Sequence, residues 1–564
     1  MERYHSPDRF SLTVLLVVLA GSLVMAQDRG SHDPRQAERG KYFEKKSYAP
    51  ALVPKFEETR LQLPSPIFDE NQLLVKLYWK AWELAFRNFH EPAANSGFVS
   101  EFIDAAFNDN IFLWDTAFMT MFCTVAHPLV PGIASLDNFY IKQHPTGEIC
   151  REIQRSSGLD FVYWVNAEDS TLFSRWGWIF PPAQQTPVLY KDRTAPTPNP
   201  RLTLDATNHP ILAWAELESY RITGDAARLR LVWEPLVRYY RAFQTYLRQG
   251  NGLYITDWAS MDNSPRNPSL NQGGTGIDIS SEMVLFARNL AEIAQLLGRQ
   301  QDAITFTTEA DELTIRINKL MWDQKDRFYY DLTLDGGRVH VKTIAAFWTL
   351  LARVATPEQA GSLVSELQNP QTFGRLHPVP TCAANEPGYY STGGYWRGAI
   401  WAPTNTMVIR GLENYGYNDL ARTIALKHLQ VVADVFERSG TIWENYAPDS
   451  KEPGRNTDSS LVAKDFVGWS GIGPILYFLE YGVGLKPNAA RNELTWRIES
   501  TRRVGCTQYR FNGRVVTLVA QPAERNRGIT ITVDSDGVFM LKIEHRGQQK
   551  VFAVSKGMNR FVVP

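Results

Sequence analysis

From about residue 71 to residue 489, apolar residues recur at steps of three and four, which is the spacing of one face of an amphipathic helix. The first such stretch is marked by Leu74, Leu77, Tyr78, Ala81 and Leu84. Few runs in this region alternate with a period of two, so we predict a mainly α domain. Further helices are predicted over residues 113–125, 210–221, 226–247, 280–297, 301–321, 341–354, 357–367, 405–415, 419–437 and 473–481.

Glycines recur at the ends of these predicted helices. Gly224, Gly298 and Gly416 each follow a helical stretch and precede a polar turn and another helix. A glycine just past a helix end takes up the left-handed conformation that caps the helix. Each second helix leads into a loop with aromatic and acidic residues. Repeated helical hairpins with their loops on one side predict a closed α/α toroid over residues 71–489.

After about residue 490 the pattern changes to short runs rich in β-branched residues. Polar turns and glycines separate these runs, as in a small antiparallel sheet or sandwich. We predict that residues 490–564 form a small antiparallel β-domain, and we favour a structural cap on the toroid over a carbohydrate-binding module. The predicted strands cover residues 515–519, 529–533, 538–544 and 551–554.

The N-terminal residues have the pattern of a secretory signal peptide. An apolar run from Phe10 to Met25 follows Arg9, and Val24 and Ala26 are the small residues that a signal peptidase reads. We therefore expect residues 1–26 to be removed and the protein to be exported, to the periplasm or the medium, without a membrane attachment. The alternative is an uncleaved membrane anchor, for which the run is short.

Residues 27–70 are polar and interrupted by prolines, and they predict an extended segment that wraps over the main domain. The net charge of the 564 residues is −1, which gives no reason to expect nucleic acid or an anionic membrane as a partner. The four cysteines have no metal-ligand spacing, so we expect no zinc site. The chemistry considered below needs neither a catalytic metal nor a redox cofactor, and we expect neither. Cys123 is expected to be a small buried apolar residue. Nothing in the sequence indicates an oligomeric state.

Aromatic residues make up 12% of the chain, including 16 tryptophans, and sugars stack their C–H faces on such rings. Two separate segments each carry an acid, Asp262 and Glu444, among aromatic and small polar residues. Such a pair suits glycosidic cleavage, because one acid protonates the leaving oxygen while the other activates water or attacks the sugar. Trp258 and Met261 are candidates for the apolar wall that would keep Asp262 protonated. Alternatively, Asp262 pairs with Arg266 and Glu444 forms an ordinary salt bridge.

Other aromatic and polar residues are candidates for the walls of a sugar site. Trp114 and Asp115 stand at a predicted helix start. Stripes of aromatic residues often belong to cores, but an arginine between rings in a loop flanked by glycines, Arg397, is harder to explain by packing. The predicted substrate contacts are Trp114, Asp115, Gln143, Trp258, Arg266, Trp396, Arg397, Trp401, Trp443 and Trp469.

Several stretches together resemble the (α/α)6-barrel glycosidases. The similarity is to glycoside hydrolase family 63, especially its bacterial mannosylglycerate and glucosylglycerate hydrolases, and more distantly to the trehalases of family 37. The sequence YWRG differs from the aromatic-acid pair of trehalases, which argues against trehalose as the substrate. Residues 27–70 leave no room for the larger N-terminal β-domain common in family 63. The matching stretches are LWDTAFM, NFYIKQHPTGEICREI, SMDNSPR, YWRGAIWAPTN, IWENYAP and FVGWSGIGPI.

The resemblance implies an inverting mechanism in which Asp262 is the general acid and Glu444 the general base. It also implies a separation of roughly 6.5–9.5 Å between the two carboxyl groups, which leaves room for the attacking water. Trp114, Asp115, Trp396 and Arg397 fall in segments that bind sugar in that family.

We therefore expect an inverting α-glycosidase that acts on a short α-linked glucoside or mannoside. Two alternatives remain. A polysaccharide lyase on the same toroid would need a tyrosine or histidine base and an arginine or asparagine beside a uronate. A non-catalytic carbohydrate-binding protein would keep the aromatic walls alone. The carboxylate pair and the near-zero net charge favour the hydrolase over the lyase.

Overall fold

The computed structural model describes residues 39–44, 48, 53–161, 209–255, 261–270, 274–523 and 528–564. The predicted signal peptide, most of the predicted extended segment before residue 53, and Trp258 lie outside these residues. Arg39–Pro564 form one compact unit. Among the helices that the structure describes, none is long and apolar enough to cross a membrane.

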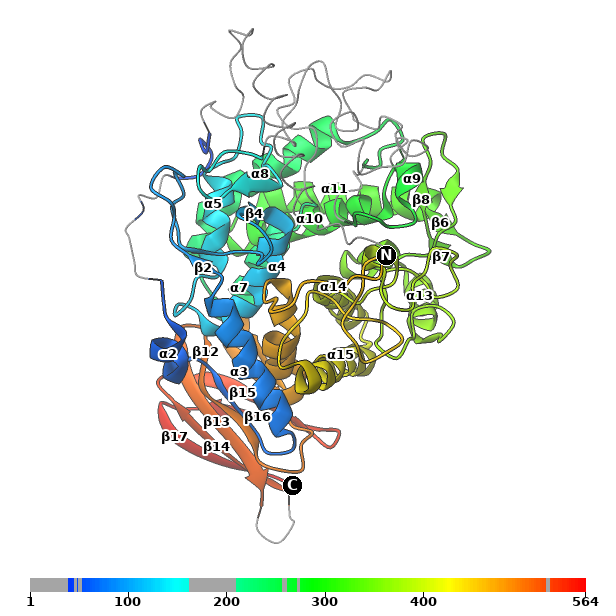
Figure 1. Cartoon of the computed structure of the whole chain (residues 1–564). Helices are drawn as coiled ribbons and strands as arrows, with labels where there is room; N and C mark the ends of the chain where they lie inside the picture. Colours follow the sequence, from blue (N-terminus) through cyan, green and yellow to red (C-terminus); the bar gives the residue numbers. More distant parts are fainter. Residues whose placement is uncertain are drawn as a thin grey trace, which may run out of the picture. The chain divides into compact units, whose positions relative to one another are not determined.

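The chain is mainly helical, with a strand-rich C-terminal region (Figure 1). The predicted helices are confirmed, with ends that differ from the predictions by a few residues. The stretch predicted as one helix over residues 341–354 instead forms two short elements. A 3-10 helix, η8 (Ile344–Phe347), is followed by one turn of α-helix, α12 (Trp348–Leu351). The main helices are α3 (Gln72–Phe86), α4 (Leu113–Cys123), α7 (Leu212–Thr223), α8 (Ala226–Tyr246), α10 (Ile277–Leu296), α11 (Gln300–Leu320), α12 (Trp348–Leu351), α13 (Pro357–Gln368), α14 (Ala402–Asn414), α15 (Asn418–Ser439) and η11 (Ile472–Val483).

The recurring glycines end helices as predicted. Gly224, Gly298 and Gly416 have φ angles of 71°, 75° and 79°. This left-handed conformation is free of strain only for a residue without a Cβ atom. Each glycine closes one helix and lets the chain turn back into the next, which sets up the antiparallel helical hairpins.

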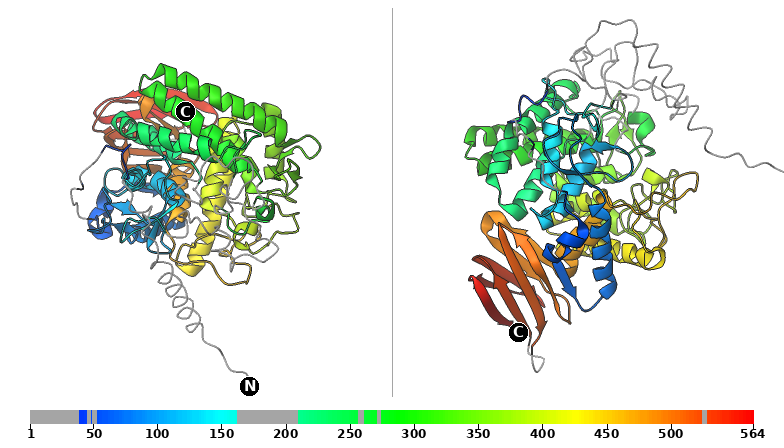
Figure 2. Two further views of the ribbon diagram at one scale, coloured as in Figure 1. Left: turned by 90° about the horizontal axis from the view of Figure 1, so that it is seen from above. Right: turned by 60° about the vertical axis from the view of Figure 1, so that its left-hand side comes forward.

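Six helices contact one another in a closed order. Helix α4 contacts α7, α7 contacts α10, α10 contacts α12, α12 contacts α14, α14 contacts η11, and η11 contacts α4 again. Further helices pack against this ring: α8 and α11 against α10, α15 against α14 and η11, and α3 against η11. Figure 1 labels α4, α7, α10 and α14 of the ring and α3, α8, α11 and α15 of the second set, and Figure 2 gives two further views of the same ribbon.

The C-terminal strands confirm the predicted β runs and form two sheets. The orders are β1-β12-β13-β14-β17 and β10-β11-β15-β16. The strands are β1 (Ser65–Phe68), β10 (Leu485–Asn488), β11 (Glu493–Arg497), β12 (Val504–Phe511), β13 (Arg514–Pro522), β14 (Ile529–Ser535), β15 (Phe539–His545), β16 (Gln548–Val554) and β17 (Gly557–Val563).

Two features of these sheets differ from the sequence-based expectation. Strand β1, from the segment predicted to be merely extended, pairs antiparallel with β12. Strands β11 and β15 are parallel, so the prediction of a purely antiparallel arrangement is wrong for this pair. A parallel pair needs a crossover connection, and the strands β12, β13 and β14 of the other sheet supply it.

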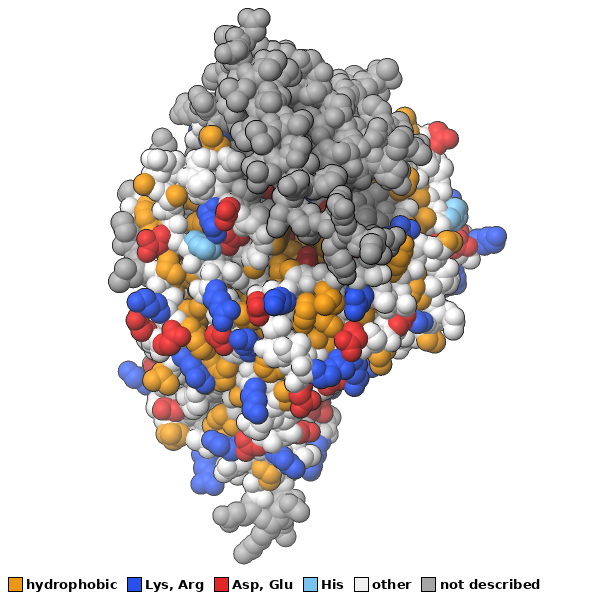
Figure 3. Space-filling view, in the orientation of Figure 1, with side chains coloured by type: hydrophobic (Ala, Val, Ile, Leu, Met, Phe, Trp, Pro, Cys, Tyr) orange, Lys and Arg blue, Asp and Glu red, His pale blue; other side chains and the backbone are white. Residues whose placement is uncertain are grey.

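All four cysteines are free and buried, which confirms the prediction for Cys123. On the face shown in Figure 3, basic and acidic side chains of the described residues are interspersed among apolar ones. This mixture is in keeping with the net charge of −1.

Candidate active site

Four tryptophans meet at the N-terminal ends of three ring helices. Trp396 and Trp401, in the loop before α14 and at its start, stack with ring centroids 4.3 Å apart and an interplanar angle of 3°. Trp114, in the first turn of α4, approaches Trp396 edge-on at 6.3 Å. Trp469, just before η11, lies 5.7 Å from Trp401. The segments predicted as sugar walls are therefore brought together by the ring.

These four rings are largely buried. Trp401 is only 1% exposed, and it lies flat against Trp396. It supports the wall from behind, so a sugar would have to stack on its neighbours. The indole N–H of Trp469 donates a 3.2 Å hydrogen bond to the carbonyl oxygen of Glu444, which ties this ring to a predicted catalytic residue.

Glu444 is fixed through its backbone and its carboxylate. Its N–H donates to the carbonyl of Ala463 at 2.9 Å, and its Oε2 accepts from the Ala463 N–H at 3.2 Å. Its carbonyl also accepts from the hydroxyl of Ser470 at 3.0 Å. A side chain bonded to the backbone of a neighbouring segment has little rotational freedom, which is useful in a group that must orient water.

The two predicted acids are electrostatically coupled. Burial raises the pKa of Glu444 to about 7, and the negative charge of Asp262 adds to the rise. Hydrogen bonds from the Ala463 N–H and the Tyr395 hydroxyl to this carboxylate lower its pKa and so limit the rise. The charge of Asp262 is thus felt at the carboxylate of Glu444, as a catalytic pair requires.

A third carboxylate, Asp115, belongs to the same cluster. It lies in the first turn of α4, and burial raises its pKa to about 7. Its own backbone N–H and Arg151 oppose the rise, whereas Asp262 adds to it. Three acids thus converge at one end of the helical ring, beside the tryptophan wall.

Tyr395 lies at the centre of this cluster, although it was not predicted as a site residue. Burial, followed by the charges of Asp262, Glu444 and Asp115, raises the pKa of its hydroxyl well above the usual value. Its backbone is left-handed, with a φ of 63°. Non-glycine residues in this conformation are often functional. The only signal in the sequence was its position beside Trp396.

The loop that carries Asp262 is held by two asparagines that were also not predicted. Asn263 donates to the carbonyl of Gly394 at 3.1 Å and accepts from the N–H of Trp396 at 2.9 Å. Asn267 donates to the carbonyl of Asp262 at 3.0 Å. Asp262 itself is exposed, so the described residues do not enclose it in the apolar wall that was expected to keep it protonated.

The position of Arg266 contradicts its predicted contact with substrate. Its side chain is 2% exposed and pairs with Asp278, at the start of α10, and with Asp331 at 2.9 Å. A guanidinium enclosed by two carboxylates offers no surface to a sugar. Arg266 instead anchors the loop behind Asp262.

Gln143 is also misassigned. It is fully buried, and its Nε2 donates to the carbonyls of Gly147 and Pro235, both at 2.9 Å. These bonds attach its loop to α8, which explains its burial. Arg397 and Trp443 are half-buried, and their substrate contacts stay predictions. The Nε of Arg397 donates to the carbonyl of Gly388 at 2.9 Å.

A protein-family model described as the mannosylglycerate hydrolase MGH1-like glycoside hydrolase domain matches residues 165–467, more than half of the chain. The chain belongs to this family. It is a glycoside hydrolase, and the resemblance to family 63 is confirmed. Family membership favours hydrolysis over the lyase and binding-protein alternatives.

Relatives of this MGH1-like hydrolase include an uncharacterized protein of Borreliella burgdorferi, 27% identical over 59% of this chain and 71% of that protein. A mannosylglycerate hydrolase of Rubrobacter radiotolerans is 31% identical over 24% of this chain and 30% of that protein. The crystal structure of a family 63 mannosylglycerate hydrolase from Thermus thermophilus in complex with glucose is 20% identical, with a TM-score of 0.51. It covers 71% of this chain and 99% of that one, and this likeness concerns the fold.

Proposed function

We propose that this hydrolase is an inverting α-glycosidase on an (α/α)6 toroid, and that it cleaves a short α-linked glucoside or mannoside. The observation that carries the proposal is the coupling of Asp262 and Glu444 beside the tryptophan wall. The names of the relatives, among them mannosylglycerate hydrolases and a probable mannosyl-oligosaccharide glucosidase of Schizosaccharomyces pombe, support this choice of substrate class. The N-terminal sequence pattern supports an exported enzyme.

In this mechanism Asp262 donates a proton to the glycosidic oxygen as its bond to the anomeric carbon breaks. Glu444 accepts a proton from a water molecule that attacks the same carbon from the opposite face. The new bond forms on the face away from the leaving group, so the configuration inverts. A separation of roughly 6.5–9.5 Å between the carboxyl groups would accommodate the water.

The surroundings of Glu444 suit a base that works near neutral pH. A general base is most effective when its pKa lies near the working pH. Burial raises the pKa of Glu444 to about 7, and the Tyr395 hydroxyl bonded to the carboxylate keeps it from rising further. In this proposal Asp115 bonds to sugar hydroxyls, and Trp114 and Trp396 stack on the ring of the sugar.

The proposal is tested with a screen of α-linked glucosides and mannosides, including mannosylglycerate and glucosylglycerate. The variants Asp262→Asn and Glu444→Gln should each lose about 10²–10⁴-fold in kcat on the best substrate while still binding it. Asp335→Asn, which changes a carboxylate in the turn between β8 (Asp331–Leu332) and β9 (Arg338–Val339), is the matched control. Full activity in either site variant would remove that residue from the mechanism.

A further inference from the structure

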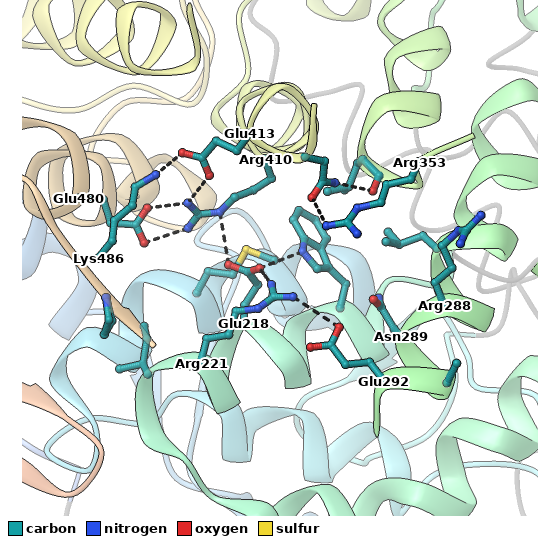
Figure 4. Close-up of a pocket in the computed structure, with 18 of the residues that line it drawn as sticks. Glu218, Arg221, Arg288, Asn289, Glu292, Arg353, Arg410, Glu413, Glu480 and Lys486 are labelled. Atoms are coloured by element: carbon teal, nitrogen blue, oxygen red, sulfur yellow. Dashed lines mark hydrogen bonds and ion pairs between the residues drawn. The ribbon is translucent and has the colours of Figure 1, made fainter. Parts of the chain in front are cut away.

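A second cavity, of about 790 Å³, lies at the other ends of the ring helices (Figure 4). Most of its lining comes from the later parts of α7, α10, α12 and α14, including Glu218, Asn289 and Asn414, and Trp214 reaches it from the first turn of α7. The candidate acids belong to loops at the N-terminal ends of the ring helices. The second cavity is therefore separate from the proposed catalytic site.

One half of this cavity is a balanced ion-pair network. Arg410 approaches Glu480 at 2.7 Å, Glu218 at 3.3 Å and Glu413 at 3.4 Å. Lys486 also pairs with Glu413. Each cation here has at least one carboxylate partner, so the charges in this half of the cavity are neutralised by its own residues.

The other half carries arginines with weaker compensation. Arg288 contacts the exposed Asp311 at 3.2 Å, and Arg353 donates at 3.0 Å to the neutral amide oxygen of Asn414. The neighbouring carboxylate, Glu292, lies 3.7 Å from Arg221. Figure 4 shows that Arg288 and Arg353 occupy the same side of the cavity. Among the described residues on this side, Arg353 therefore faces a neutral partner where Arg288 faces a carboxylate.

Asn289 lines the same side of the cavity. It is 6% exposed, and its amide nitrogen has no hydrogen-bond partner within the part of the chain that the structure describes. A buried amide without a partner is unfavourable, because it loses its hydrogen bonds to water. The Asn289 side chain lines the cavity beside Arg288 (Figure 4). A ligand that accepts a hydrogen bond would satisfy it.

The backbone of Arg353 adds an independent observation. This residue lies two positions after the end of α12 and has a φ of 55°, in the left-handed region that favours glycine. A strained non-glycine residue is a reason to look for a function of its side chain. Here the side chain is a guanidinium at the rim of a cavity.

We propose that this cavity binds a small organic anion through a carboxylate or phosphate group held by Arg288, Arg353 and Asn289. Two guanidinium groups bind such oxyanions through charge-assisted and bidentate hydrogen bonds. The Asn289 amide would donate a further bond. Trp214 and Leu285, which also line the cavity, provide an apolar surface for the carbon skeleton. The inference does not depend on the proposed catalytic roles.

The test is isothermal titration calorimetry on the full chain with two probes, inorganic phosphate and D-glucuronate. Arg353→Gly removes the guanidinium and places at this position the residue that suits its backbone. Arg327→Gly is a matched control, because Arg327 has a φ of 52°, is partly exposed and does not line the cavity. We expect saturable binding of at least one probe, weakened about tenfold or more by Arg353→Gly and unchanged by Arg327→Gly.

The probe that binds identifies the phosphate or the carboxylate as the recognised group. Asp262→Asn should leave this binding unchanged, which separates the second cavity from the catalytic site. The proposal is overturned if neither probe binds saturably below about 10 mM. It is equally overturned if Arg353→Gly changes the melting temperature but not the binding. The arginine would then act only as a positive charge that stabilises the C-terminal ends of the neighbouring helices.

Discussion

Asn263 accepts a 2.9 Å hydrogen bond from the backbone N–H of Trp396, 133 residues further along the chain. The same side chain donates to the carbonyl of Gly394 at 3.1 Å. One amide thus joins the loop of Asp262 to the loop of the stacked tryptophans. The position of the proposed acid relative to the sugar wall therefore depends on a residue that does not itself carry out chemistry.

Asn263→Ala should reduce kcat/KM by about 10–100-fold, because a small displacement of a catalytic group has a large effect on rate. We expect most of the loss in kcat, with a minor change in melting temperature. Steady-state kinetics and thermal unfolding measure both. Asn559→Ala, which removes comparable bonds in the turn before β17, is the control and should leave the kinetics unchanged. Unaltered kinetics in the Asn263 variant would show that the hydrogen bonds between the two loops do not contribute to catalysis.

The pH profile should reflect the ionisation of Glu444. A base must be unprotonated, and the pKa of Glu444 is raised to about 7. As pH falls below this value, kcat/KM should drop about tenfold per unit, whereas above it the rate stays level until a second group titrates. A profile that stays flat down to about pH 5 would argue against Glu444 as the base.

Tyr395→Phe should move this acidic limb to higher pH. The tyrosine hydroxyl bonds to the Glu444 carboxylate and lowers its pKa, so its loss allows the pKa to rise. The variant should consequently lose more activity at about pH 6 than at about pH 8. A uniform loss across the profile would mean that Tyr395 acts through packing or substrate contact.

Asp262→Asn should be rescued by a substrate with a good leaving group. Since the general acid protonates the departing oxygen, an aryl glycoside with an acidic phenol needs little help. We expect the activity ratio of wild type to variant to be at least about tenfold smaller for such a substrate than for an alkyl glycoside. Glu444→Gln should show no such difference. The reverse pattern would exchange the roles of the two acids.

Arg266→Met should destabilise the protein by about 3–5 kcal/mol, because it leaves Asp278 and Asp331 as buried carboxylates without their cation. Chemical denaturation measures this loss. Arg87→Met, which removes an exposed i,i+4 pair with Glu83, should change the free energy of unfolding by ~0.5 kcal/mol or less. Equal effects of the two substitutions would contradict a buried anchoring role for Arg266.

The features that could be predicted from the sequence are those set by local pattern. Helical periodicity, β-branched runs and the glycines at 224, 298 and 416 depend on neighbouring residues, and the structure confirms them. The pairing of β1 with β12 and the parallel pair β11–β15 depend on contacts between distant segments. Pro66 within β1 also reads as a strand breaker, so nothing local marked it as part of a sheet.

Among the residues of the candidate site, too, some are marked by local sequence whereas others depend on contacts between distant segments. Asp262, Glu444 and the tryptophans stood out by their residue types. Of the tryptophans, the structure brings together Trp114, Trp396, Trp401 and Trp469. Arg266 and Gln143 also have the residue types of sugar-binding groups. Their burial is decided by partners far along the chain, which periodicity does not reveal. Tyr395 was missed because its backbone conformation is invisible in the sequence.

The most direct test of the account is the configuration of the first-formed product, followed by proton NMR on an α-linked substrate that the enzyme cleaves. If Asp262 and Glu444 act across a bound water, the β-anomer must appear first and then mutarotate to the equilibrium mixture. Initial release of the α-anomer would contradict the inverting mechanism and the proposed roles of both acids.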